Sequence, residues 1–230
     1  MKYNEWEPYY KKILNDFKFK EEEDIKSAEI LDQILNDKCQ KQLDFLKEKI
    51  QGKEVVIFGA GPSIIESIIM HREIIDKKTT ISADGATTAL KELGILPDII
   101  TTDLDGVISD IIQANTKKSF IVLHAHGDNI EKIKKYSEKF NKNLIGTTQA
   151  DPKKFKNLYN FGGFTDGDRA IFLSEHLKAE KIHLIGFDFN DEIGKYSYTK
   201  PYNIENKKMK LKWCKKLIDI LQKKHQNIYY

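Results

Sequence analysis

Short apolar segments alternate with amphipathic ones through the middle of the chain, and this alternation limits the possible folds more than any other feature. Apolar residues recur at helical spacing between these segments. Continuous apolar strands joined by helices are typical of a mostly parallel sheet covered on both faces. We therefore predict a doubly wound, Rossmann-like α/β fold. The predicted strands are EVVIF (54–58), TTISA (79–83), DIITT (98–102), SFIVL (119–123), NLIGTT (143–148) and KIHLIGFDF (181–189).

The two ends of the chain have a different pattern. Residues 1–51 are dense in charge and carry apolar residues at helical spacing, as in the run from Ile30 to Leu35. We predict an N-terminal helical segment over 1–51 and an α/β catalytic domain over 52–230, which ends in a helix at about 207–224. Exposed apolar stripes on the N-terminal helices would favour a homodimer.

The overall charge does not point to a polyanionic partner. The 38 basic and 35 acidic residues leave a formal net charge of +3, and the lysines of ENKKMKLKW (205–213) are expected to form a solvated helix face. No segment approaches the roughly 18 apolar residues of a membrane helix, and MKYNEWEPYYKKIL is too polar for a secretory signal. We expect no nucleic-acid or membrane partner and a cytoplasmic location.

Glycine together with an acid, an amide or a hydroxyl follows nearly every predicted strand. Ligands bind at the carboxyl ends of the strands in sheets of this kind, so these residues are candidates for a site. The segments are GAGPS (59–63), DGA (84–86), DLDG (103–106), HAHGDN (124–129), GTTQ (146–149) and the glycine-rich loop FGGFTDGDRA (161–170).

The GAGPS turn resembles the start of a dinucleotide-binding fingerprint, but Ile64 stands where the third glycine would be. A more general interpretation is a tight turn whose backbone N–H groups face a phosphate or another anion. The alternative is a strand-to-helix turn without a ligand. The residues expected to approach a phosphate or a polar substrate group are Gly59, Gly61, Pro62 and Ser63.

Asp103 and Asp105 flank Leu104 at the end of a predicted strand, so both carboxylates point to one side if the chain stays extended. Oxygen ligands of this kind suit Mg²⁺. Together with Asp84 and Asp166 they form our predicted metal site. Each aspartate could instead cap a helix.

The HAHGDN and GTTQ segments offer polar groups for a substrate. No third histidine or cysteine accompanies the His-x-His pair, so a substrate contact is favoured over a transition-metal site, and His124 could simply be a buried core residue. Hydroxyl and amide groups of GTTQ are suited to recognising a heterocycle. The candidate binding residues are His126, Asp128, Asn129, Thr147, Thr148 and Gln149.

The FTDGDRA segment begins a predicted helix. Thr165 and Asp166 stand at its N-cap and Asp168 in its first turn, where they bind substrate or act as caps alone. Arg169 is one of two arginines in a chain that otherwise uses lysine, which favours bidentate recognition of a phosphate. It could instead tether Asp166 or Asp168.

In these motifs the chain resembles the archaeal-type 6-hydroxymethyl-7,8-dihydropterin pyrophosphokinase family, which shares the fold of thiamine pyrophosphokinase catalytic domains. The resemblance covers most of 55–189. It implies transfer of a pyrophosphoryl group from ATP to the hydroxymethyl group of a reduced pterin, with AMP as the other product, in tetrahydromethanopterin or archaeal folate biosynthesis. The matching segments are VIFGAGPS, SADGATTAL, PDIITTDLDG, HAHGDN, GTTQ, GGFTDGDRA and IGFDF.

The resemblance also implies roles for residues. Asp84, Asp103, Asp105 and Asp166 match acids that bind Mg²⁺ and nucleotide phosphates in thiamine pyrophosphokinases, whereas Val107 and the HAHGDN segment depart from them and argue against thiamine as the substrate. We expect these four acids and Arg169 to be catalytic, with Asp128 or His126 assisting removal of the alcohol proton.

Three other classes of protein remain open. They are a nicotinamide-dependent oxidoreductase, a nucleotide-sugar-dependent glycosyltransferase-like enzyme and a non-catalytic nucleotide-binding regulator.

Overall fold

An all-parallel sheet forms the centre of the computed structural model, which describes residues 1–35, 39–141, 143–190 and 192–230 and the side chains of these residues except those of 39–41. The strands lie in the order β6-β5-β4-β3-β2-β1-β7-β8. Their bounds are β1 (Glu54–Phe58), β2 (Thr79–Ala83), β3 (Ile99–Thr102), β4 (Phe120–Ala125), β5 (Leu144–Thr148), β6 (Leu158–Tyr159), β7 (Lys181–Ile185) and β8 (Ile228–Tyr229).

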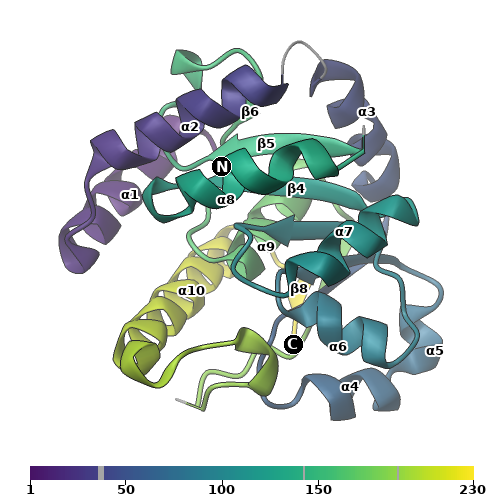
Figure 1. Cartoon of the computed structure of the whole chain (residues 1–230). Helices are drawn as coiled ribbons and strands as arrows, with labels where there is room; N and C mark the ends of the chain where they lie inside the picture. Colours follow the sequence, from purple (N-terminus) through teal and green to yellow (C-terminus); the bar gives the residue numbers. More distant parts are fainter. Residues whose placement is uncertain (36–38, 142, 191) are drawn as a thin grey trace.

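Helices cover both faces of this sheet (Figure 1). One face packs against α1, α3, α9 and α10. The other packs against α2 and α4 to α8. The bounds are α1 (Tyr3–Phe17), α2 (Glu21–Leu35), α3 (Cys39–Ile50), α4 (Ile64–Met70), α5 (Arg72–Ile75), α6 (Ala86–Glu92), α7 (Ile108–Thr116), α8 (Ile130–Tyr136), α9 (Asp166–His176) and α10 (Ile204–Lys224).

The predicted α/β class and the six predicted strands are confirmed. Strands β1 to β5 are buried almost throughout because helices lie on both sides of them, which explains their continuous apolar sequences. Edge strands β6 and β8 were not predicted, since two residues are too few to show a period. His71 separates α4 from α5.

The N-terminal helices share the hydrophobic core of the α/β domain. Trp6, Tyr10 and Ile13 of α1 are 0–1% exposed and belong to the cluster on one face of the sheet. Ala28 and Leu31 of α2 are fully buried in the cluster on the opposite face. The apolar stripes from which we expected a homodimer are therefore covered by the chain's own sheet and are not exposed.

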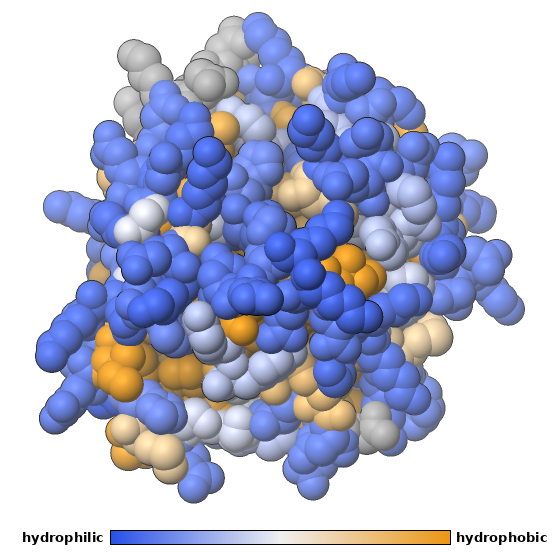
Figure 2. All heavy atoms as spheres, turned by 180° about the vertical axis from the view of Figure 1, so that it is seen from behind, coloured by the Kyte–Doolittle hydropathy of each residue, from blue (hydrophilic) through white to orange (hydrophobic). Residues whose placement is uncertain are grey.

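The molecular surface is mostly hydrophilic, with small apolar areas. Figure 2 shows this on the face seen from behind, where apolar side chains gather at the lower left. The most exposed large apolar residues of α4 and α5 are Ile69, Met70 and Ile74. None of the helices in the described ranges combines the length and the apolar character that crossing a membrane requires.

Candidate active site

The strand order reverses at β1. Strands β2 to β6 follow one another on one side of β1, and β7 and β8 lie on its other side. Ligands of doubly wound sheets bind where such a reversal separates two strand ends. A cleft of about 990 Å³ lies at this place, between the ends of β1, β2, β3 and β7, the start of α9 and one face of α10. We call it the central cleft.

The loops after β1 and β7 hold each other at one wall of the central cleft. The Gly61 N–H donates to the Gly186 carbonyl at 2.9 Å, and the Ser63 N–H and Oγ both donate to Asp188 Oδ2, at 3.0 and 2.8 Å. A Cβ atom at Gly61 would lie 2.2 Å from Asp188 Oδ2, so only glycine fits there. Gly59 and Gly61 line the cleft, whereas Pro62 and Ser63 do not.

These contacts correct the anion-binding interpretation of GAGPS. The Gly59 N–H also donates within the protein, to the Ile185 carbonyl at 2.8 Å. Because the N–H groups of Gly59, Gly61 and Ser63 already have acceptors, this turn offers few donors to a phosphate. Its observed role is to join two strand ends closely.

Three carboxylates meet at the floor of the central cleft. Asp84 follows β2, Asp103 follows β3 and Asp166 is the first residue of α9. One oxygen from each lies within 4.8 Å of the others. An all-oxygen donor set of this size fits a hard divalent cation such as Mg²⁺.

Strained backbone fixes two of these carboxylates. Asp84 has a φ of +37° and Leu104 a φ of +69°, which are unusual for residues other than glycine. Thr102 secures both turns, because its Oγ donates to Asp84 Oδ1 and accepts from the Leu104 N–H at 2.8 Å. Leu104 is fully buried, so hydrophobic burial stabilises the turn that presents Asp103.

Crowded negative charge makes this group receptive to a cation. Burial and the neighbouring Asp103 raise the pKa of Asp84 to about 7. The same two causes raise the pKa of Asp166 well above its ordinary value. Burial also acts to raise the pKa of Asp103, but the hydrogen bond with His126 and the charges of Arg169 and Lys210 lower it below its ordinary value. A divalent cation would relieve the repulsion among the three.

Asp105 lies apart from the other three acids, contrary to our expectation. The left-handed conformation of Leu104 ends the extended chain, so Asp103 and Asp105 do not point to one side. The Asp105 carboxylate is 59% exposed and forms an ion pair with Lys132. Asp105 still lines the edge of the central cleft.

The start of α9 combines capping with an ion pair. Asp168 is fully buried and accepts from the N–H groups of Phe164 and Thr165, at 2.6 and 2.9 Å, so it acts as a cap and does not line the cleft. Thr165 does line it. Arg169 Nη1 lies 3.2 Å from Asp166 Oδ1 and 4.0 Å from Asp103 Oδ2, which is the tethering that we considered as an alternative.

Two residues of the HAHGDN segment contact Asp103. His126 Nε2 lies 3.3 Å from Asp103 Oδ2. Asn129 is fully buried and donates to the carbonyls of Asp103 and His124, so it is structural and was wrongly expected to contact substrate. His124 is also buried, and burial lowers its pKa well below the ordinary value. Asp128 is exposed.

A second hollow of about 410 Å³ adjoins the central cleft, and we call it the side pocket. The two share Asp103, Phe164 and Lys210. The other walls of the side pocket come from α2 and from the loops after β4 and β5, and include Phe19, Asp24, His126, Asp128 and Gln149. Of the expected GTTQ residues, only Gln149 lines it, because Thr147 and Thr148 are buried deeper around a small internal cavity.

Asp24 of α2 organises the side pocket. Its Oδ1 accepts from the Gly127 N–H and its Oδ2 from Gln149 Nε2, both at 2.8 Å. Since Asp24 can only accept, the Gln149 amide is oriented with Nε2 toward it. Gln149 Oε1 is buried and has no hydrogen-bond partner among the described residues.

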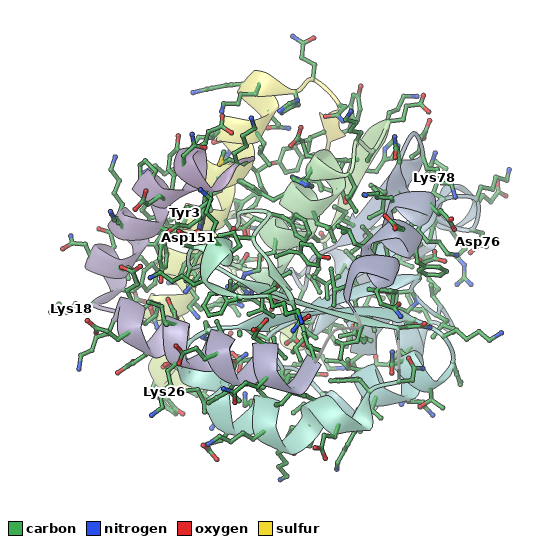
Figure 3. The ribbon with its side chains drawn as sticks, turned by 90° about the horizontal axis from the view of Figure 1, so that it is seen from above. Tyr3, Lys18, Lys26, Asp76, Lys78 and Asp151 are labelled. Atoms are coloured by element: carbon green, nitrogen blue, oxygen red, sulfur yellow. The ribbon has the colours of Figure 1, made fainter. Side chains whose placement is uncertain are left out.

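Helix α1 closes the region behind Gln149. The Trp6 Nε1 donates to the Gln149 carbonyl at 3.1 Å. Figure 3 places Tyr3 of the same helix beside Asp151, which follows β5. Burial, with Glu7, Glu21 and Asp151 nearby, raises the pKa of Tyr3 to about 12.

Sequence reasoning missed several residues that line these hollows. Asp188 follows β7 in the quoted GFDF segment, and its position at a strand end was the available signal. Lys207 and Lys210 of α10 line the central cleft, although ENKKMKLKW was expected to be a solvated face. Asp24 gave no signal, because a single acid in a charged helix is unremarkable.

The fold and the central cleft define a doubly wound α/β enzyme with an acidic centre suited to a divalent cation. The family described as 6-hydroxymethylpterin diphosphokinase MptE-like matches residues 29–194. The chain therefore belongs to the MptE-like family of 6-hydroxymethylpterin diphosphokinases and is a transferase.

Three curated relatives, each named 6-hydroxymethyl-7,8-dihydropterin pyrophosphokinase, are similar over nearly their whole length. The protein of Methanocaldococcus jannaschii is 46% identical, with 97% of both chains covered. That of Pyrococcus furiosus is 41% identical over 96% of this chain and 95% of its own. That of Methanothermobacter thermautotrophicus is 41% identical over 95% of this chain and 94% of its own.

Proposed function

We propose that this protein transfers the pyrophosphoryl group of ATP to the hydroxymethyl oxygen of 6-hydroxymethyl-7,8-dihydropterin. The alcohol oxygen attacks the β-phosphorus, the bond from that phosphorus to the oxygen retained by AMP breaks, and the alcohol proton is released. The products are the pterin diphosphate and AMP, as a route to tetrahydromethanopterin or an archaeal folate requires. The observation that carries the proposal is the group of Asp84, Asp103 and Asp166 at the floor of the central cleft.

The three carboxylates would hold Mg²⁺, as their oxygen-only donors and crowded charge favour. Bound there, the cation would neutralise charge on the phosphates during an in-line displacement. This use of strand-end acids is the one implied by the likeness to thiamine pyrophosphokinases. Asp105 would add negative charge at the cleft edge without joining the three.

The two adjoining hollows support separate sites for the two substrates. The central cleft carries the acids and is open to solvent, so we assign ATP to it. We assign the pterin to the side pocket, where Gln149 Oε1 has no hydrogen-bond donor among the described residues and the aromatic residues Phe19 and Phe164 belong to the lining. A pterin ring carries N–H donors on its pyrimidine edge and has planar faces that stack on aromatic rings.

The residues near the shared wall are suited to handling the alcohol proton. His126 lines the side pocket with Nε2 3.3 Å from Asp103 Oδ2, and its Nδ1 accepts from the Asp128 N–H at 3.3 Å, so it would accept the alcohol proton on Nδ1 in place of that backbone contact. Arg169 would act indirectly, by orienting Asp166 and Asp103. Positioning and electrostatics would then supply most of the catalysis.

A product assay tests this proposal. Purified protein is incubated with ATP, Mg²⁺ and either 6-hydroxymethyl-7,8-dihydropterin or thiamine, and the products are identified by mass spectrometry. AMP together with pterin diphosphate is the expected result, and EDTA should abolish it. Formation of ADP, or turnover that survives exhaustive chelation, would contradict the proposed reaction.

A further inference from the structure

One face of α10 lines the central cleft. The contributing residues are Lys207, Lys210, Leu211 and Cys214, whose spacing places them on a single helix face. Lys208 belongs to another face and pairs with Glu205 at 3.5 Å. The lysines of this helix therefore fall into two groups, of which one faces the cleft.

The central cleft has a large excess of negative groups. Its lining includes six carboxylates, those of Asp84, Asp103, Asp105, Asp166, Asp188 and Glu192. Arg169 is engaged with Asp166 and Asp103 and is 9% exposed, so it cannot freely meet a phosphate. Within the described ranges, Lys207 and Lys210 are the only cationic side chains that line the cleft.

Both lysines are available for a ligand. They are partly buried, and neither forms an ion pair in the part of the chain that the structure describes. Lys210 Nζ lies 5.9 Å from the centre of the Phe164 ring, which holds the ammonium group at the wall shared with the side pocket. Lys207 lies one helical turn earlier and borders only the central cleft.

We propose that Lys207 and Lys210 form a phosphate clamp on α10, in which Lys207 binds the nucleotide side of the triphosphate and Lys210 the group that is transferred. This inference rests on the proposed function, because it takes Mg-ATP as the occupant of the cleft. A cation at the boundary between the two hollows would stabilise negative charge where the acceptor oxygen meets the β-phosphorus. Mg²⁺ would offset part of the negative charge in the cleft, and the two lysines would reduce the repulsion that remains between the carboxylates and a polyphosphate.

Binding of Mg-ATP, measured by isothermal titration calorimetry, tests the clamp without requiring turnover. Lys207→Met and Lys210→Met should each weaken binding about tenfold, as loss of one charge-assisted contact predicts. Lys208→Met, a matched change on the same helix outside the cleft, should bind Mg-ATP as the wild type does. Lys210→Arg should retain most of the affinity, because it keeps the charge.

Kinetics then separate the two lysines. Lys207→Met should chiefly raise KM for ATP, and Lys210→Met should also lower kcat about tenfold. The inference is overturned if both cleft variants match the wild type and Lys208→Met in Mg-ATP affinity. If the wild-type protein itself binds no Mg-ATP, both the phosphate clamp and the proposed function are wrong. If the wild type binds Mg-ATP and the Lys207→Met and Lys210→Met variants bind it equally well, only the phosphate clamp is wrong and the proposed function stands.

Discussion

Asn129 donates from Nδ2 to the backbone carbonyl of Asp103 at 3.0 Å, which ties the loop after β4 to the loop that presents a central carboxylate. The same amide group donates to the His124 carbonyl at 2.7 Å, and Oδ1 accepts from the His126 N–H and from Ser27. A single buried side chain thus holds Asp103 and His126 in register.

Asn129→Asp is expected to destabilise the protein and to reduce turnover. A carboxylate keeps the shape but cannot donate to the two carbonyls, so the free energy of unfolding should fall by about 2 kcal/mol, or roughly 4–8 °C in Tm. Thermal denaturation followed by circular dichroism measures this. Asn206→Asp, an exposed change on α10, is the control. Equal Tm values for the two variants would show that the Asn129 hydrogen bonds do not stabilise the loops that they join.

Asp103→Asn should be far more damaging than Asp105→Asn. Asp103 belongs to the three clustered carboxylates, so its neutralisation should lower kcat on the order of 10²–10³-fold. Asp105 is 59% exposed and paired with Lys132, so its loss should cost less than about tenfold. Steady-state AMP formation measures both. Comparable losses of kcat in the two variants would show that Asp105 contributes to catalysis as much as Asp103 does.

Without a divalent cation, stability should fall as the pH rises from about 4 to about 7, because over this range folded Asp84, with its pKa raised from 3.8 to about 7, keeps a proton that the unfolded chain has released. Mg²⁺ needs the deprotonated carboxylate, so its stabilising effect should grow over the same interval. Tm measured with and without Mg²⁺ near pH 5 and near pH 8 tests both signs.

Asp84→Asn provides the matched control for this pH dependence. The apo variant should have a higher Tm than the wild type near pH 8, by several degrees, because a buried charge is removed. Mg²⁺ should then stabilise it less. An undiminished Mg²⁺ effect in Asp84→Asn would exclude this carboxylate as a ligand.

Gln149→Met should weaken acceptor binding and leave Mg-ATP binding unchanged. The substitution keeps the side-chain length but removes both the buried Oε1, which we assign to the pterin N–H groups, and the Nε2 that donates to Asp24. The KM for the pterin should therefore rise about tenfold. Gln113→Met, an exposed change on α7, is the control. A pterin KM equal to that of the control would show that Gln149 does not bind the pterin.

The sheet was predictable because strands buried on both faces have continuous apolar sequences. The acids at strand ends were predictable for a related reason, since parallel strands bring their carboxyl ends to one edge of the sheet. Asp84, Asp103 and Asp166 therefore meet as expected, although they are separated by up to 82 positions in the chain.

The remaining details depend on conformations that a residue pattern does not encode. Leu104 adopts a left-handed conformation, which residues other than glycine or asparagine rarely adopt. This single turn directs Asp105 away from Asp103. Asn129 and Asp168 have the residue types of ligands but use their polar atoms to hold the backbone. The lysines of α10 could not be sorted without knowing which helix face meets the sheet.

The side pocket and the central cleft draw on both ends of the chain. Asp24 of α2 orients Gln149, and Lys210 of α10 stands at the wall between the two hollows. The central sheet, in contrast, is encoded mostly between these helices. During synthesis on the ribosome the sheet can therefore begin to assemble before the site is complete, because both hollows also need α10, which lies C-terminal to most of the strands.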